Sequence, residues 1–193
     1  MFVELGQIPD AVACYERIAQ VSLREGEPQK AFENYKKVTE LEPEVISKRL
    51  RLAELYSREK MVNEAVEQFS VCASQLFKEN RANEYVRVAE RLLYHREDVP
   101  VIKNLVRVYL DENQPKRALP KLNGLLQKHP NDGLGLELLA ETFVQLGKQD
   151  KAAKVVLEAV RIYIDEEVDG KSKAIGALKK GIDLLGSHAD LER

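Results

Sequence analysis

The chain has 193 residues, of which 44% are hydrophobic and 32% are charged, and its formal net charge is −2. This is enough apolar material for a real core, and the slight acidic surplus argues against a nucleic-acid binder, which usually carries a basic one. Only 6% of the residues are aromatic and none is tryptophan, which disfavours an all-β fold. No apolar run approaches the roughly 20 residues that span a bilayer, and no signal-peptide pattern opens the sequence. We therefore expect a cytoplasmic protein of bacterial type.

Two cysteines, Cys14 and Cys72, lie in stretches with helical patterning, on mostly apolar faces. We expect both to be reduced thiols in the core rather than a disulfide or a metal pair.

Three glycines each precede an alanine by five positions. The pairs are Gly6 and Ala11, Gly26 and Ala31, and Gly147 and Ala152. This spacing predicts a tight turn that leads into a helix whose alanine packs closely against its neighbour. The alanine recurs at Ala65 and Ala118, where Lys60 and Asn113 replace the glycine; asparagine tolerates the turn better than lysine does. Recurrence at a fixed spacing indicates a helical repeat.

The chain is expected to start in mid-repeat, because Met1 falls in the middle of a first helix and Phe2 takes its aromatic position. We prefer the interpretation that the chain is a piece of a longer protein. Ala11 precedes Ala31 by only 20 residues, so a long helix over 10–25 is expected to close one helical pair and to open the next.

The clearest unit is Val12–Val45. In its first helix Tyr15, Ile18, Ala19 and Ser22 share one face, and in its second helix Ala31, Tyr35 and Val38 do so. Gly26 ends the first helix. Pro28 then begins the second, since the N–H that proline lacks has no partner in a first turn anyway, and Pro43 stops it.

Three later units repeat this scheme. Their inward positions are Leu52, Ala53, Tyr56, Ala65 and Phe69 in one, Leu105, Val106, Tyr109, Ala118, Leu122 and Leu125 in another, and Leu136, Leu139, Ala140, Phe143, Ala152, Val156 and Ala159 in the last. Ala31 and Ala65 are 34 residues apart, as are Ala118 and Ala152, but Ala65 and Ala118 are 53 apart. The longer spacing between Ala65 and Ala118 predicts a long helix over 63–79 that closes one helical pair and opens the next. Pro120 predicts either a helix that starts only near Ala118 or a kink.

Two helices lie outside the regular pattern. An irregular extra helix is expected near 82–94, with Tyr85, Val88, Ala89, Leu92 and Leu93 turned inward. A C-terminal helix over 171–186 carries Ala174, Leu178, Ile182 and Leu185 on one stripe and is expected to cap the array. The alternative is a detachable segment that docks elsewhere.

These residues resemble the tetratricopeptide repeat (TPR), a 34-residue helix–turn–helix. The match rests on the Leu–small–Tyr pattern of the first helix, the small and aromatic residues of the second, and the closing proline, as in Gly26, Ala31, Tyr35 and Pro43. The fourth position departs from the family's tryptophan. The resemblance implies an all-α superhelical array of ten or eleven antiparallel helices without strands, over residues 1–193 as a single domain.

The resemblance also implies a concave face, lined by exposed positions of each first helix. Transferred to this sequence, the candidate peptide-binding residues are Arg51, Glu54, Arg58, Lys103, Asn104, Arg107, Glu137 and Glu141, with Asp111, Leu138 and Gln145 beside them. The middle of this strip is basic and its end acidic, which suits a peptide with acidic residues at one end. The Lys–Asn carboxylate clamp of the chaperone-binding subclass is not supported, because those positions hold Glu16 and Gln20, or Lys103 and Arg107.

No catalytic or metal-binding constellation is visible. His95, His129 and His188 lie far apart, and carboxylate pairs such as Glu137 and Glu141 have the spacing of a solvated helix face. Arg87, Arg91 and His95 form a basic stripe on the extra helix; a solvated face explains it better than an anion or RNA surface does, since Glu84 and Glu90 lie among these residues.

We therefore expect a non-catalytic scaffold without metal or cofactor that binds a protein or peptide partner and no nucleic acid. The alternative is self-association through exposed terminal repeats of a larger protein.

Overall fold

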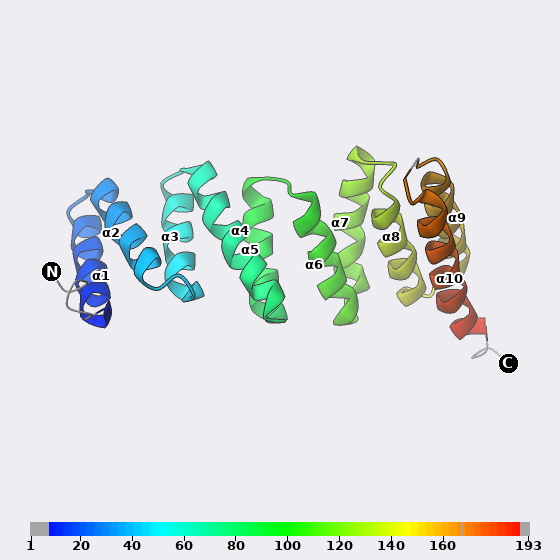
Figure 1. The fold of residues 1–193 in the computed structure, drawn as a ribbon, viewed down its shortest axis with the longest axis horizontal. Coiled ribbons are helices and arrows are strands. Elements are labelled where there is room, and N and C mark those ends of the chain that lie inside the picture. Colours follow the sequence, from blue (N-terminus) through cyan, green and yellow to red (C-terminus); the bar gives the residue numbers. More distant parts are fainter. Residues whose placement is uncertain (1–7, 167, 190–193) are drawn as a thin grey trace. The chain divides into compact units, whose positions relative to one another are not determined.

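Ten helices make up the part of the chain that the structure, a computed structural model, describes: residues 8–166 and 168–189 (Figure 1). They are α1 (Ile8–Arg24), α2 (Pro28–Leu41), α3 (Ile46–Arg58), α4 (Val62–Lys78), α5 (Ala82–His95), α6 (Val99–Asp111), α7 (Pro115–Lys128), α8 (Gly133–Gln145), α9 (Gln149–Ile164) and α10 (Gly170–Ala189). No strand occurs within these residues, so the predicted all-α fold is confirmed. The expectations for Met1, Phe2 and Gly6 fall outside the described residues.

The helices group into two compact units, with α1 to α5 in the first and α6 to α10 in the second. In each unit, successive helices pack side by side and alternate in direction (Figure 1).

A left-handed residue closes most of the hairpins. At Gly26, for example, the N–H of Glu27 donates to the carbonyl of Ser22 at 2.8 Å, which pairs a carbonyl that the end of α1 leaves free. The residues with positive φ at such turns are Gly26, Lys60, Asn80, Asn113 and Gly147. Lys60 and Asn113 therefore adopt the glycine conformation, as the spacing predicted. Asn80 shows that α4 is joined to α5 by the same kind of turn that joins α3 to α4.

The two units repeat one plan at an interval of 87 residues, which the sequence reasoning missed. Helices α2, α3 and α4 begin at residues 28, 46 and 62, and helices α7, α8 and α9 begin at 115, 133 and 149. Identical residues at this interval include Leu23 and Leu110, Pro28 and Pro115, Ala31 and Ala118, Pro43 and Pro130, Ala53 and Ala140, Glu54 and Glu141, and Ala65 and Ala152. The 53-residue gap between Ala65 and Ala118 is thus one repeat plus the fifth helix of the first unit.

Most predicted inward positions form the core. Ala31, Tyr35 and Val38 are buried, as are Tyr85, Ala89 and Leu92 of α5. Their counterparts in the later units are buried too, except Val156, which is partly buried. Two predictions for α1 were wrong: Ile18 is 38% exposed and Cys14 is exposed, because α1 buries the face of Ala11, Val12, Ala19 and Ser22 instead. Cys72 is the core thiol that was expected, and burial raises its pKa to about 11.

Helix α10 covers the end of the second unit with a different face from the one predicted. Ala174 is buried as expected, but Leu178 and Ile182 point outward, and the other buried positions are Ala177 and Gly181. Small residues form the buried face of α10 because this helix approaches α9 closely. A Cβ on Gly181 would lie 2.6 Å from Cγ1 of Val156.

Helix α7 starts at Pro115 and runs through Pro120. The expectation that the helix might begin only near Ala118 is therefore wrong. Pro115 occupies the first turn, where its missing N–H leaves no bond unmade.

Two glycine substitutions of opposite sign test the role of the left-handed turn. Around both Gly147 and Gly124 an added Cβ meets no atom within 4 Å, but only Gly147 has a positive φ, of 70°. We expect Gly147→Ala to lower the free energy of unfolding by about 1 kcal/mol, the cost of a left-handed non-glycine residue. Gly124→Ala, inside α7, is the matched control and should raise it by roughly 0.5–1 kcal/mol. Urea unfolding measures both, and equal effects would contradict the turn assignment.

Candidate functional site

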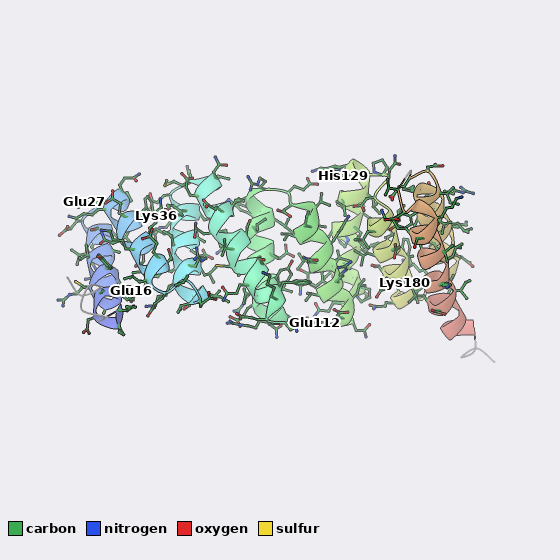
Figure 2. The ribbon with its side chains drawn as sticks, viewed as in Figure 1. Glu16, Glu27, Lys36, Glu112, His129 and Lys180 are labelled. Carbon is green, nitrogen blue, oxygen red and sulfur yellow. The ribbon has the colours of Figure 1, made fainter. Side chains whose placement is uncertain are left out.

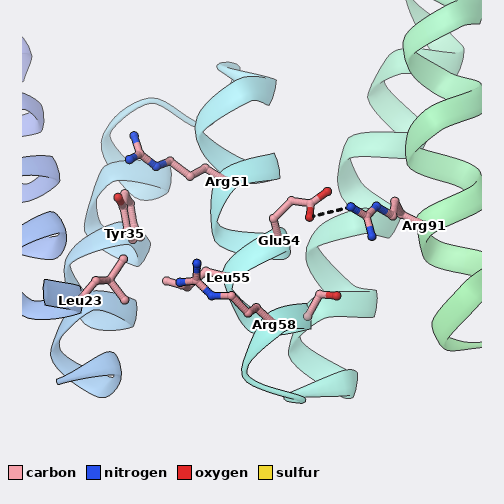
Figure 3. Close-up of a pocket in the computed structure, with 8 residues that line it drawn as sticks. Leu23, Tyr35, Arg51, Glu54, Leu55, Arg58 and Arg91 are labelled. Carbon is pink, nitrogen blue, oxygen red and sulfur yellow. Dashed lines mark ion pairs between the residues drawn. The ribbon is translucent and has the colours of Figure 1, made fainter. Parts of the chain in front are cut away.

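Three predicted groove residues meet in one cavity of the first unit. Arg51, Glu54 and Arg58 of α3 line it together with Arg91 of α5, and its volume is about 460 Å³ (Figure 3). We call it the arginine cavity; its remaining lining residues are Leu23, Tyr35, Leu55 and Ser57. Because three arginines face one glutamate, the lining carries a net positive charge within a chain that is acidic as a whole.

The cavity's only carboxylate, among the residues that line it, is already engaged. Oε2 of Glu54 lies 3.3 Å from Nη2 of Arg91, an ion pair that joins α3 to α5 (Figure 3). Arg51 instead lies over the ring of Tyr35, with its guanidinium carbon 5.2 Å from the ring centre. Arg58 has Glu59 beside it at 3.6 Å, but both side chains are exposed, so water screens this pair. Arg51 and Arg58 therefore leave positive charge at the cavity.

Tyr35 brings a neutral donor to the wall of the cavity. Tyr35 is 1% exposed, and its hydroxyl has no hydrogen-bond partner among the described residues. Burial raises the pKa of Tyr35, and the charges of Arg51 and Arg58 oppose that rise. The hydroxyl is therefore protonated at neutral pH and can donate.

The basic stripe on α5 divides into different roles. Arg91 belongs to the arginine cavity, whereas Nε2 of His95 lies 2.8 Å from Oγ of Ser57 and its ring stacks on Phe69. Arg87 is exposed. A solvated face, the interpretation preferred from sequence, thus describes Arg87 and the 57% exposed side chain of Arg91, but not His95, which contacts α3 and α4.

In the second unit the predicted groove residue Lys103 forms an ion pair between two helices of the fold. Its Nζ lies 2.7 Å from Oδ1 of Asp132, and the two side chains are only 18% and 13% exposed. The same Asp132 oxygen accepts from the N–H of Gly135 and so caps α8. Lys103 therefore links α6 to the start of α8. Arg107 is exposed and Asn104 is half-buried on the same helix.

The predicted acidic end of the groove is engaged as well. The hydroxyl of Tyr163 donates to Oε1 of Glu137 at 2.6 Å, and Nζ of Lys180 lies 3.2 Å from Oε2 of Glu141. Lys180 comes from α10, which lies beside α8 (Figure 2). Leu138, which the family pattern places at an exposed position, is only 2% exposed. Helix α10 thus occupies the side of α8 on which a partner was expected.

Within the described residues, no group of three or more His, Cys, Asp or Glu side chains is placed to hold a metal ion. None of the helices described is both long and apolar enough to cross a membrane.

Comparison with known sequences identifies the repeat. The family model for the tetratricopeptide repeat matches residues 12–45, which cover most of α1, all of α2 and the turn after α2. This is the unit that the sequence pattern placed at Val12–Val45. These residues of the chain therefore form a tetratricopeptide repeat. No curated protein sequence matches the chain.

Solved structures share the TPR fold. YrrB, described as a TPR protein with an unusual peptide-binding site, aligns with a TM-score of 0.50 and 17% identity over 86% of this chain and 90% of YrrB. A MamA protein aligns with a TM-score of 0.46 and 16% identity, over 80% of this chain and 92% of MamA. MamA 41-end from Desulfovibrio magneticus RS-1 gives 0.45 and 19%, over 92% and 97%. At 17% identity the likeness to YrrB shows the fold alone.

The Lys103–Asp132 pair predicts which cation of α6 is structural. Lys103→Met should lower the free energy of unfolding by about 1–3 kcal/mol, because it leaves the half-buried Asp132 carboxylate without its charged partner. Arg107→Met on the exposed side of α6 is the matched control and should stay within about 0.5 kcal/mol of the wild type. Thermal or urea unfolding distinguishes them, and a neutral Lys103→Met would contradict the structural role.

Proposed function

We propose that this TPR protein is a non-catalytic scaffold that binds a protein or peptide partner through exposed positions of its first helices. The observation that carries the proposal is the arginine cavity, which gathers Arg51, Glu54 and Arg58 from α3, the positions where the family pattern places partner contacts. A TPR fold implies interaction rather than turnover. YrrB, which has the same fold, is described as a TPR protein with an unusual peptide-binding site.

The binding contacts divide between groups that are available and groups that are not. Arg51, Arg58 and Arg107 are exposed and can meet a partner, whereas Lys103 and Glu141 are held in ion pairs between helices. The proposal therefore drops the acidic end of the groove as a primary contact and assigns partner selection to the exposed arginines, since charge governs specificity more than affinity.

Charge reversal at two of these arginines tests the scaffold. Arg51→Glu/Arg107→Glu should lose most of the partner that the wild-type chain captures from a lysate of the source organism, because both exposed cations become anions. Arg87→Glu/Arg96→Glu is the matched control: it makes the same change in net charge at exposed arginines outside the arginine cavity. Capture followed by mass spectrometry gives the readout. Retention of the same partners in the first variant would show that these positions do not bind them.

Self-association is a second candidate, favoured by apolar side chains at both ends of the helix series. On α10, Ile175 and Ile182 are 54% and 66% exposed, and on α1 Ile18 and Val21 are 38% and 42% exposed. Burying such side chains against a second copy stabilises a complex by about 1.5–3 kcal/mol for each one fully covered. Contact of α1 with α10 of another copy joins different surfaces, so it would build a chain of copies rather than a closed dimer.

Light scattering over a range of concentrations tests this second candidate. The mass should rise above the 21.9 kDa of one chain as concentration increases. Ile175→Glu/Ile182→Glu should restore the monomer by placing charges in the contact. A wild-type chain that stays monomeric at high concentration would remove self-association.

A further inference from the structure

The last helix of the second unit turns its small residues inward and its large apolar residues outward. On α10, Ala174, Ala177 and Gly181 are buried, whereas Ile175 and Ile182 are 54% and 66% exposed. A helix that served only to cover the end of the unit would bury its largest apolar side chains. The exposed isoleucines therefore contribute little to the fold.

Helix α9 continues this apolar surface. Val160 of α9 belongs to one core cluster with Ala174 of α10. Leu157 and Ile164 lie one helical turn before and after Val160, and both are more than half exposed. Leu178 lies in the same way one turn after Ala174, so the exposed residues of both helices border the contact between α9 and α10 (Figure 1). We call this surface the α9–α10 ridge; its large apolar residues are Leu157, Ile164, Ile175, Leu178 and Ile182.

Such exposure is not a general property of the chain. From residue 95 to residue 156, a range that the structure describes in full, no leucine, isoleucine, valine, phenylalanine or tyrosine is exposed. Exposed apolar side chains that gather in one place, rather than occurring singly, mark an interaction surface.

The ridge also carries positive charge. Lys171 and Lys179 are exposed, and they lie one helical turn before and after Ile175. Helix α10 holds four lysines and a single acidic residue, Asp183, so it is basic within a chain whose formal net charge is −2. The complement of this ridge is a surface that is both apolar and negatively charged.

We propose that the α9–α10 ridge binds the surface of a bilayer that contains anionic lipids. Ile175, Leu178 and Ile182 enter the boundary between headgroups and acyl chains, and Lys171 and Lys179 remain at the level of the lipid phosphates. Lysine suits this place because its apolar stem lies along the lipid while its ammonium group reaches the phosphate. The helix lies on the bilayer and does not span it. This inference goes beyond the scaffold proposal and does not depend on it.

The composition of the ridge favours a lipid surface over a protein partner. Its large apolar side chains are all aliphatic, and all the basic residues of α10 apart from His188 are lysines. The centres of protein interfaces are instead enriched in tyrosine, tryptophan and arginine, and they are depleted in lysine.

Contact of the ridge with α1 of a second copy is poorly matched in charge. The cavity beside the exposed Ile18 and Val21 of α1 is lined by two cations, Arg17 and Lys30, and by one carboxylate, Glu25. A basic ridge would therefore meet a face that is itself slightly basic, and like charges oppose association.

Sedimentation with lipid vesicles tests the proposal on the full chain. Vesicles of phosphatidylcholine alone are compared with vesicles that also contain phosphatidylglycerol. We expect the wild-type chain to bind the anionic vesicles about tenfold more tightly than the neutral ones, and less tightly as salt increases. Ile175→Ser/Ile182→Ser should lower the affinity about tenfold. Lys171→Gln/Lys179→Gln should remove the preference for anionic vesicles.

Matched controls carry the same changes away from the ridge. Val62→Ser/Val71→Ser alters two side chains of α4 that are each 42% exposed, and Lys78→Gln/Lys116→Gln alters two exposed lysines of α4 and α7. Both controls should stay within about twofold of the wild type, because charges outside the contact are screened by salt. The melting temperature of each variant shows that the chain stays folded.

A tryptophan reports whether the ridge enters the lipid. The chain has no tryptophan, so Ile175→Trp introduces a single fluorophore. Anionic vesicles should shift its emission to shorter wavelength, and lipids with brominated acyl chains should quench it. Val71→Trp, at an exposed position of α4, is the matched control and should show neither effect.

Three results would overturn the proposal. Equal binding to neutral and anionic vesicles would exclude recognition of anionic lipid. Equal losses in the ridge variants and in their matched controls would place the contact elsewhere. If the emission of the Ile175→Trp chain shifted with protein concentration in the absence of vesicles, and the mass from light scattering rose with it, the ridge would bind a second copy instead.

Discussion

The fold depends on closing most helical hairpins with a left-handed residue two positions beyond the last residue of the helix. That conformation lets the next N–H return to a carbonyl of the last turn, as Met61 does to Tyr56 at 2.9 Å. It also fixes the distance to the alanine five positions on, which is fully buried at Ala31, Ala65, Ala118 and Ala152. Because a hairpin of this size cannot bury its own apolar face, the turn and the alanine together allow neighbouring helices to cover one another.

A duplicated plan explains why the period is irregular. Each unit consists of two helical hairpins and a fifth helix, and the fifth helix reuses α4 or α9 as its partner. In each unit a cation of the fifth helix pairs with the equivalent glutamate of the third helix, Arg91 with Glu54 and Lys180 with Glu141. The two cations are 89 residues apart, so the two fifth helices do not keep the interval of 87 residues. The contacts of α10 with α8 and α9 argue for α10 as an integral part of the second unit rather than as a detachable segment.

Sequence reasoning found the helices, the turns and most of the core, because proline, glycine and alanine act locally and their spacing survives in the sequence. It placed Arg51, Glu54 and Arg58 together for the same reason, since one helix carries all three. It failed where two helices decide the outcome. The outward face of α10 depends on how closely Gly181 lies to Val156, and the pairing of Lys103 depends on Asp132, 29 residues away. The unsatisfied hydroxyl of Tyr35 is likewise a property of packing; only its position at an aromatic slot is visible in the sequence.

The contrast between the two units bears on how a scaffold of this kind acquires specificity. Where Leu110, Leu122 and Leu138 fill the second unit, that unit gains buried apolar area and loses an opening. Where Tyr35 and Arg51 stand in the first, that unit gives up that area and keeps a space with uncompensated charge. An ion pair to the fifth helix is present in both units, but its side chains are partly exposed, so it adds little to the stability of the fold. In the first unit the pair engages Glu54, so the charges of Arg51 and Arg58 are not neutralised by that carboxylate. A contact that contributes little to folding thereby influences the charge that the site presents.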